Sequence, residues 1–269
     1  MTTRWEAEVW IVLVLLACGL LSLPATATAQ KTLALDPDLL ANSDALKVRL
    51  GVQTPGRMWK FKFGEYALVS SKMGAEVTTT SSIFNPVEKS RAKQKFSFVI
   101  KGTGPETATV KAAQNLASEA LSEFAVSSRL SVSAVDISGT DDNLAATIVL
   151  DGDGETPWTL ILNVKSHWAV LKEETRAAFL TNGTREIAIA PVTSNAPGAK
   201  SSGKPALGYE FSEEGRVLGA VQYWGGGILG SNKNVIYLRR DLEPRTRLLL
   251  AAAMTAIIQA KMDALGALD

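Results

Sequence analysis

The chain has 269 residues, with 28 basic and 27 acidic side chains, a net charge of +1 and 46% hydrophobic residues. This composition argues against a disordered chain, and the charge balance argues against a nucleic acid partner, which requires an excess of basic surface. Cys18 is the only cysteine and His167 the only histidine. The sequence therefore predicts no catalytic residue, no metal site and no cofactor.

Residues 1–29 are typical of a signal peptide. The apolar run Val9–Leu23 would form a helix of about 22 Å, which is shorter than the roughly 30 Å core of a bilayer. Small residues at Ala27 and Ala29 provide the spacing that signal peptidase accepts. We expect cleavage between Ala29 and Gln30, and export to the periplasm or the extracellular space.

Two alternatives remain open for this segment. The run Leu15–Cys18 resembles a lipoprotein box, in which Cys18 would be lipidated and would anchor the protein to a membrane. The segment could also stay uncleaved as an anchor. Removal of residues 1–29 would leave 27 basic and 25 acidic side chains and no cysteine, so no disulfide could stabilise the mature protein.

The next residues divide into an arm and a domain. Residues 30–56 are rich in turn-forming residues and predict a linker or N-terminal arm with a short helix over 45–50. A single β-rich domain is expected over 57–269. Its first strand is indicated by Trp59, Phe61 and Phe63, which alternate with lysines.

The rest of the domain reads as short strands separated by turns, with one helix among them. The sequence Asn182-Gly183 is its strongest hairpin signal. An amphipathic helix is predicted from Pro105 to Ser127, with apolar residues three and four positions apart. The remaining strands are expected at 66–69, 75–80, 95–100, 130–137, 145–150, 158–164, 167–171, 177–180, 186–190, 207–211, 217–223 and 235–239.

The C-terminal third contains a flexible stretch and a second helix. Residues 191–205 are rich in proline, glycine and serine, and they predict a surface loop within the domain, with a domain boundary as the alternative. Leu248–Ala260 carries no charge and is apolar on every side. Such a helix is buried or spans a membrane, and its length of about 20 Å favours burial in the core.

The order of elements at the C-terminus resembles the end of the tubby, scramblase and LURP-one superfamily. The resemblance covers Tyr209–Phe211, Glu214–Val217, Val235–Leu238 and Leu248–Ile258. It implies a closed sheet of about twelve strands around an apolar C-terminal helix. The expected fold is thus β-rich (α+β), with an antiparallel sheet or closed barrel of about 11–13 strands packed on a buried C-terminal helix and one further amphipathic helix.

Three groups of residues are candidates for ligand binding. Tyr223 and Trp224 precede three glycines and could form an aromatic rim, or a wide hairpin loop in which Trp224 folds inward. Arg239 and Arg240 begin a cluster with Arg245 and Arg247 that could hold an anion or a lipid headgroup, although the interleaved acids also predict salt bridges. The glycine turn 102–104 between apolar segments partly matches a phosphate-binding loop.

The functional expectation is an exported domain with a non-catalytic binding or structural role in the periplasm, the envelope or the extracellular space. One alternative is an exported hydrolase that cleaves glycans with two carboxylates, which needs no histidine. The other is a lipid-binding protein at a membrane surface, with an envelope or membrane partner. Neither alternative leaves a short motif in this sequence.

Overall fold

The computed structural model describes residues 32–74, 94–114, 142–152, 156–164, 175–194, 205–226 and 233–266. The segment predicted to be a signal peptide, with Cys18, Ala29 and Gln30, lies outside these residues, as do His167 and the strands expected at 75–80, 130–137 and 167–171. The fold is β-rich, with thirteen described antiparallel strands in a nearly closed barrel and a C-terminal helix packed on them.

The described helices are α2 (Pro37–Asn42) and α4 (Pro244–Gly266). The described strands are β1 (Ser43–Lys47), β2 (Arg49–Leu50), β3 (Phe61–Phe63), β4 (Tyr66–Met73), β5 (Gln94–Lys101), β6 (Thr107–Gln114), β7 (Asp142–Leu150), β8 (Trp158–Val164), β9 (Thr175–Thr181), β10 (Glu186–Thr193), β11 (Leu207–Glu213), β12 (Arg216–Trp224) and β13 (Val235–Arg239).

One continuous segment closes the sheet. The strand order runs from β1 through β13 and back down to β2, so β1 and β2 are its two edges. Only Val48 separates these two strands in the sequence, and its backbone N–H donates to the carbonyl of Asn234 at 3.0 Å. The segment 43–50 therefore pairs with β13 through its first half and with β3 through its second half.

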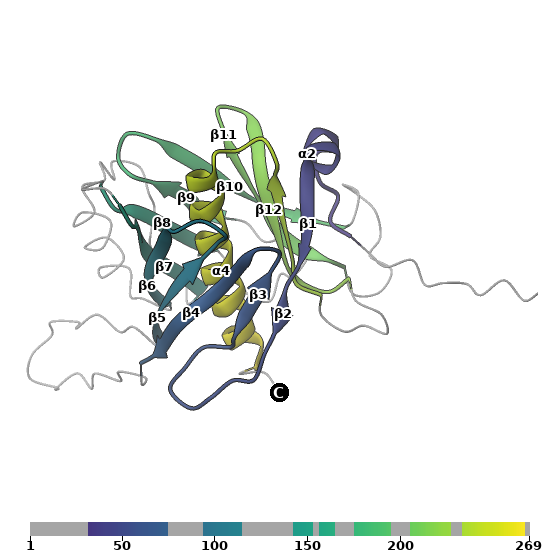
Figure 1. The fold of residues 1–269 in the computed structure, drawn as a ribbon. Helices are drawn as coiled ribbons and strands as arrows, with labels where there is room; N and C mark the ends of the chain where they lie inside the picture. Colours follow the sequence, from purple (N-terminus) through teal and green to yellow (C-terminus); the bar gives the residue numbers. More distant parts are fainter. Residues whose placement is uncertain are drawn as a thin grey trace, which may run out of the picture. The chain divides into compact units, whose positions relative to one another are not determined.

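Helix α4 fills the interior of the barrel. Figure 1 shows it, in yellow, running among the strands, with β4 to β9 on one side and β10 to β12 on the other. Leu248–Ala260 is buried on every side of the helix, because inward side chains of the strands pack around it. The prediction of a buried core helix is confirmed.

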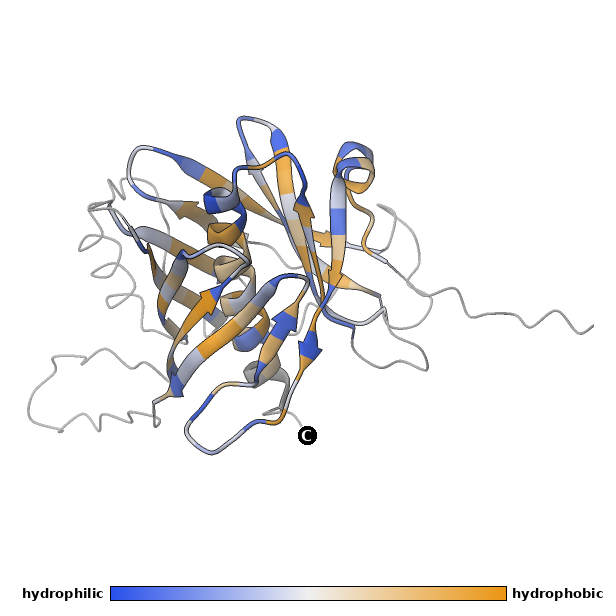
Figure 2. Cartoon of the chain, viewed as in Figure 1, coloured by the Kyte–Doolittle hydropathy of each residue, from blue (hydrophilic) through white to orange (hydrophobic). Residues whose placement is uncertain are grey.

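The interior of the sheet follows the two-residue period expected from the sequence. In β3, Phe61 and Phe63 are 2% and 1% exposed, whereas Lys62 between them faces the solvent. Figure 2 shows the same alternation of apolar and polar residues along the strands. The hairpin at Asn182-Gly183 is also confirmed: Gly183 has φ = +89°, and β9 pairs with β10 across it.

Residues 32–42 form a second layer outside the barrel. Leu33, Leu35 and Leu39 pack on the outer face of the sheet against Ala220 and other residues of β11 to β13. Asp36 caps α2 by accepting hydrogen bonds from the backbone of Asp38 and Leu39 at 2.8 and 3.1 Å. The helix therefore lies at 37–42, and the prediction of a helix at 45–50 is wrong, because those residues belong to β1 and β2.

The predicted amphipathic helix starting near Pro105 is also wrong where it can be followed. Thr107–Gln114 forms β6, in which Ala108, Val110 and Ala112 are buried and their neighbours face outward. Pairing with β5 and β7 on both sides overrides the helix propensity of the alanines. The rest of the predicted helix lies outside the described residues.

The predicted loop at 191–205 is shorter in the structure. β10 extends to Thr193, and just before β11 the N–H of Ser194 donates to the carbonyl of Ala206, whose own N–H donates to Oγ of Ser194. Residues 195–204 lie outside the described part. Because β10 and β11 pair directly, this segment connects neighbouring strands of one sheet.

Candidate functional site

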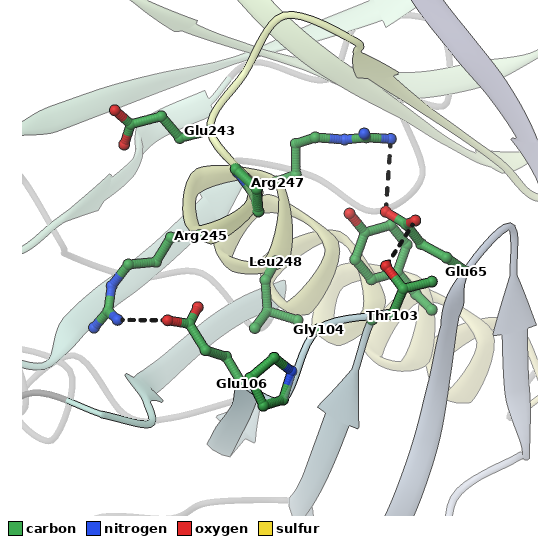
Figure 3. Close-up of a pocket in the computed structure, with 12 residues that line it drawn as sticks. Glu65, Thr103, Gly104, Glu106, Glu243, Arg245, Arg247 and Leu248 are labelled. Atoms are coloured by element: carbon green, nitrogen blue, oxygen red, sulfur yellow. Dashed lines mark hydrogen bonds and ion pairs between the residues drawn. The ribbon is translucent and has the colours of Figure 1, made fainter.

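A pocket of about 620 Å³ lies where α4 begins. Its walls come from the turn between β3 and β4, the turn between β5 and β6, and the first turn of α4, as Figure 3 shows. The lining residues are Glu65, Tyr66, Gly102, Thr103, Gly104, Pro105, Glu106, Glu243, Pro244, Arg245, Arg247 and Leu248. This volume is in the usual range for small-molecule sites, roughly 300–1,000 Å³.

Two arginines occupy the first turn of α4, with acidic side chains around them. The Nη1 atom of Arg245 lies 3.2 Å from a carboxylate oxygen of Glu106. The Nη2 atom of Arg247 lies 3.6 Å from Asp44 and 3.8 Å from Glu65. Cations are disfavoured near the N-terminal end of a helix, where the helix dipole is positive. The positive charges of the two arginines are therefore in an unfavourable position relative to the helix dipole at this pocket.

Arg247 has an unmet hydrogen-bonding capacity. Its Nε atom is buried, and no described residue provides an acceptor for it. The carboxylates of Asp44 and Glu65 are beyond ordinary hydrogen-bond distance from the guanidinium group. Buried donors are normally satisfied, and an exception calls for an explanation. Because this atom has almost no accessible surface, a ligand in the pocket would reach the guanidinium group through its Nη atoms; the side chain as a whole is 20% exposed.

Tyr66 closes the inner wall of the pocket. Its side chain is only 2% exposed, and burial raises the pKa of its hydroxyl well above the usual value. The group therefore stays protonated at neutral pH and can act as a neutral hydrogen-bonding group. A Cβ atom on Gly102 would lie 3.2 Å from the Tyr66 ring, so glycine at this position leaves room for the ring.

The structure separates the four predicted ligand residues from this pocket. Tyr223 lies inside the barrel and is 6% exposed. Its ring stacks on Tyr209 with 5.4 Å between the centroids, and Nζ of Lys261 lies 5.4 Å from the Tyr223 ring. Trp224 is half-buried and packs on the core, which agrees with the alternative in which it folds inward.

The two predicted arginines lie beside the N-terminal arm. Arg239 is buried and pairs with Asp38 of α2 and with Asp241. Arg240 donates to the carbonyls of Ser43 and Ala41, both at 2.6 Å, and pairs with Asp44. These contacts hold the arm on the sheet, and one of them, Arg239 with Asp241, is a salt bridge to an acid interleaved in the cluster.

Sequence reasoning identified two parts of the pocket but did not join them. It noted the glycine turn 102–104 as an incomplete match to a phosphate-binding loop, and Arg245 and Arg247 as members of an arginine cluster for which salt bridges were the favoured interpretation. The structure brings these two segments together at the start of α4. Sequence reasoning missed Glu65 and Tyr66 of this pocket. No local sequence pattern links them to the two arginines about 180 positions later.

Among the described residues, no group of histidine, cysteine, aspartate and glutamate side chains is arranged to hold a metal ion. Within the same residues, no helix is both long enough and apolar enough to cross a membrane. No protein-family model, curated protein or solved structure matches this chain.

Proposed function

We propose that this chain is an exported, non-catalytic binding domain that holds a small anionic ligand in the pocket at the start of α4. The observation that carries this proposal is the Arg247 guanidinium group at the pocket wall, which lies 3.6 and 3.8 Å from the carboxylates of Asp44 and Glu65. A carboxylate or another planar oxyanion could accept hydrogen bonds from both Nη groups of one guanidinium group at the same time.

The charges of the pocket restrict the ligand further. Glu65, Glu106 and Glu243 line the walls, so a ligand with several negative charges would meet repulsion. The arrangement favours a ligand with a single oxyanion on a neutral or cationic body. Such a ligand would place its anionic end on Arg247 and its other end toward the glutamates.

Binding can be tested by isothermal titration of the mature protein with butyrate, 4-aminobutyrate and butylamine. We expect the two carboxylates to bind, 4-aminobutyrate more tightly, and butylamine to fail. Arg247→Gln should weaken carboxylate binding about 10- to 100-fold, since it removes a hydrogen-bonded charge. The matched control is Arg216→Gln, an exposed arginine paired with Asp241 away from the pocket. Equal binding by Arg247→Gln and the wild type would refute the proposal.

Export is tested separately by mass spectrometry of the mature N-terminus from the native host. A chain that begins at Gln30 would support signal cleavage. A lipidated Cys18 would support the tethered alternative, and an intact Met1 would refute export by cleavage.

The hydrolase alternative has less support in the pocket geometry. A general acid on a glycosidase is usually a desolvated carboxyl group. The side chains of Glu65 and Glu106 are 34% and 40% exposed, and each lies beside a guanidinium group. Release of reducing sugar from a panel of polysaccharides, lost on Glu106→Gln, would favour the hydrolase over the binding domain.

The lipid-binding alternative and the resemblance to the tubby, scramblase and LURP-one superfamily both stay predictions. Two of the four arginines on which lipid binding depended, Arg239 and Arg240, are engaged by carboxylates and backbone carbonyls. Flotation with anionic and neutral liposomes tests the lipid alternative, and failure to float with either would remove it.

A further inference from the structure

The outer face of the first half of the barrel carries a group of exposed cations, which we call the basic wall. It extends over β1 to β6 and the loop between β2 and β3. Its members are Lys47, Arg49, Arg57, Lys60, Lys62, Lys72, Lys95, Lys101 and Lys111, all exposed. Within the described residues, none of these nine side chains has an acidic partner.

The same stretch of chain has almost no acidic residues. In the described residues 43–74 and 94–114, the acids are Asp44, Glu65 and Glu106. All three lie beside Arg245 or Arg247 at the pocket. Among the described residues, the positive charge of the outer wall is therefore uncompensated, even though the whole chain has a net charge of only +1.

Strand register lines up part of the basic wall. Arg49 of β2 lies directly opposite Lys62 of β3. The row continues through Ala67 of β4 to Lys101 of β5. Neighbouring strands are about 4.8 Å apart, so these cations form a closely spaced row across the sheet. Like charges directly opposite each other on paired strands destabilise a sheet. A role in binding an anionic partner would account for retaining them.

The side chains between the cations of the basic wall indicate which kind of anionic partner it suits. In the described part of the wall they are small or β-branched side chains such as Ser70, Ser97, Val99 and Thr109. Its only aromatic side chain near the surface, Trp59, packs partly on the core. Binding of single-stranded nucleic acid uses exposed aromatic rings, and membrane-surface proteins use aromatic or large apolar anchors. Within the described residues the wall has no exposed aromatic ring, and its exposed apolar side chains, Leu50, Val52 and Val69, are scattered among the cations, so charge is its dominant feature.

The shape of the wall also favours a flexible linear partner. Its cations are spread over six strands of a sheet that curls into a nearly closed barrel, so they face different directions. A flat bilayer would meet few of them at once, whereas a flexible chain can follow the curve. Lysine ammonium groups, which predominate here, act as point charges and do not demand one acceptor geometry.

We propose that the basic wall binds a linear acidic polysaccharide. Its carboxylate or sulfate groups pair with the lysine row, and binding releases counterions and weakens as salt rises. This surface is separate from the pocket, and the inference does not depend on the ligand proposed for Arg247.

The test is titration of the mature protein with a heparin dodecasaccharide at several salt concentrations. The variant Lys60→Gln/Lys62→Gln/Lys101→Gln removes three wall charges. The matched control, Arg185→Gln/Arg216→Gln/Lys233→Gln, removes three charges elsewhere and gives the same net charge. We expect at least tenfold weaker binding and a salt dependence reduced by roughly two ions for the wall variant. The control should change binding less than about threefold, and Arg247→Gln should leave it unchanged.

Other outcomes would overturn the proposal. Equal losses in the two triple variants would mean that only net charge matters. Failure of the wild type to bind heparin, or weaker binding to heparin than to a 30-nucleotide single-stranded DNA or to vesicles with anionic lipid, would assign the wall to another partner. Circular dichroism and thermal melts of both variants check that the folded state is retained, which we expect because five of the six side chains are exposed and Lys233 is half-buried.

Discussion

The cations on the two sides of this barrel differ in whether they pair with acidic side chains. On the side of β9 to β13, Arg185, Arg216, Arg239 and Arg240 each pair with a carboxylate. On the side of β1 to β6, nine exposed lysines and arginines have no acidic partner among the described residues. The side of β9 to β13 uses its charges in contacts within the fold, and the side of β1 to β6 leaves them available to a partner. Substitutions should therefore affect stability on the paired side and binding on the other.

The largest stability effect is expected where the arm covers the paired side. Leu39 of α2 is fully buried on the outer face of the sheet, whereas its neighbour Leu40 is 51% exposed. Leu39→Ala should lower the free energy of unfolding by about 2–5 kcal/mol through lost burial and a cavity. Leu40→Ala, in the same helix, should stay within about 0.5 kcal/mol. Similar denaturation midpoints for the two variants would show that the arm is not firmly packed.

A smaller loss of stability is expected when Arg239 is substituted, and this loss should depend on pH. Hydrogen bonds from Arg239 are the main cause of the lowered pKa values of Asp38 and Asp241. A carboxyl group with a lowered pKa stabilises the fold above its unfolded-state value and loses that contribution as the pH falls through its folded-state value. Arg239→Gln should lower Tm by roughly 2–4 °C at pH 7. The difference from wild type should shrink below about pH 4. A difference that persists at pH 2 would contradict this electrostatic origin.

The smallest effect should have the opposite sign on the unpaired side. Lys62→Glu places a carboxylate opposite Arg49 in place of a like charge, so it should stabilise the protein by about 0.2–1 kcal/mol. Urea denaturation measures this gain, and Lys111→Glu provides a control on the same wall, opposite Ser97 and Thr147. The gain should disappear in Arg49→Gln/Lys62→Glu. If Lys62→Glu stabilises the protein and loses polysaccharide binding, the like charges of the basic wall lower folding stability but are needed for binding.

The features that the sequence predicted well depend on local periodicity. Phe61 and Phe63 alternate with lysines, and the apolar run before Ala260 has no polar side, so burial follows directly from the pattern. Over 107–114, spacings of two and of three residues both connect apolar positions. Pairing with the two neighbouring strands makes this segment a strand, β6, and not a helix. That pairing cannot be recognised from the local sequence.

Other features were missed because their signals are short or distributed. Asp36 followed by Pro37 is a cap and first-turn signal that could have located α2, but it was interpreted as a turn. The basic wall was hidden because the net charge averages over the whole chain. Counting acids over 45–63, where there are none, would have revealed it. The pocket could not be predicted, since it joins Tyr66 to Arg247 across the barrel.

The closing segment has a consequence for folding during synthesis. Ser43 at the start of the barrel pairs with Arg239 near its end, and α4, which fills the interior, follows still later. A chain that emerges with its N-terminus first cannot close its sheet or complete its core until its last helix is available. Pairings across such long sequence separations make folding slow. Until α4 has been synthesised, the early strands cannot pack against it. This is the longest period in which a holding chaperone could bind them.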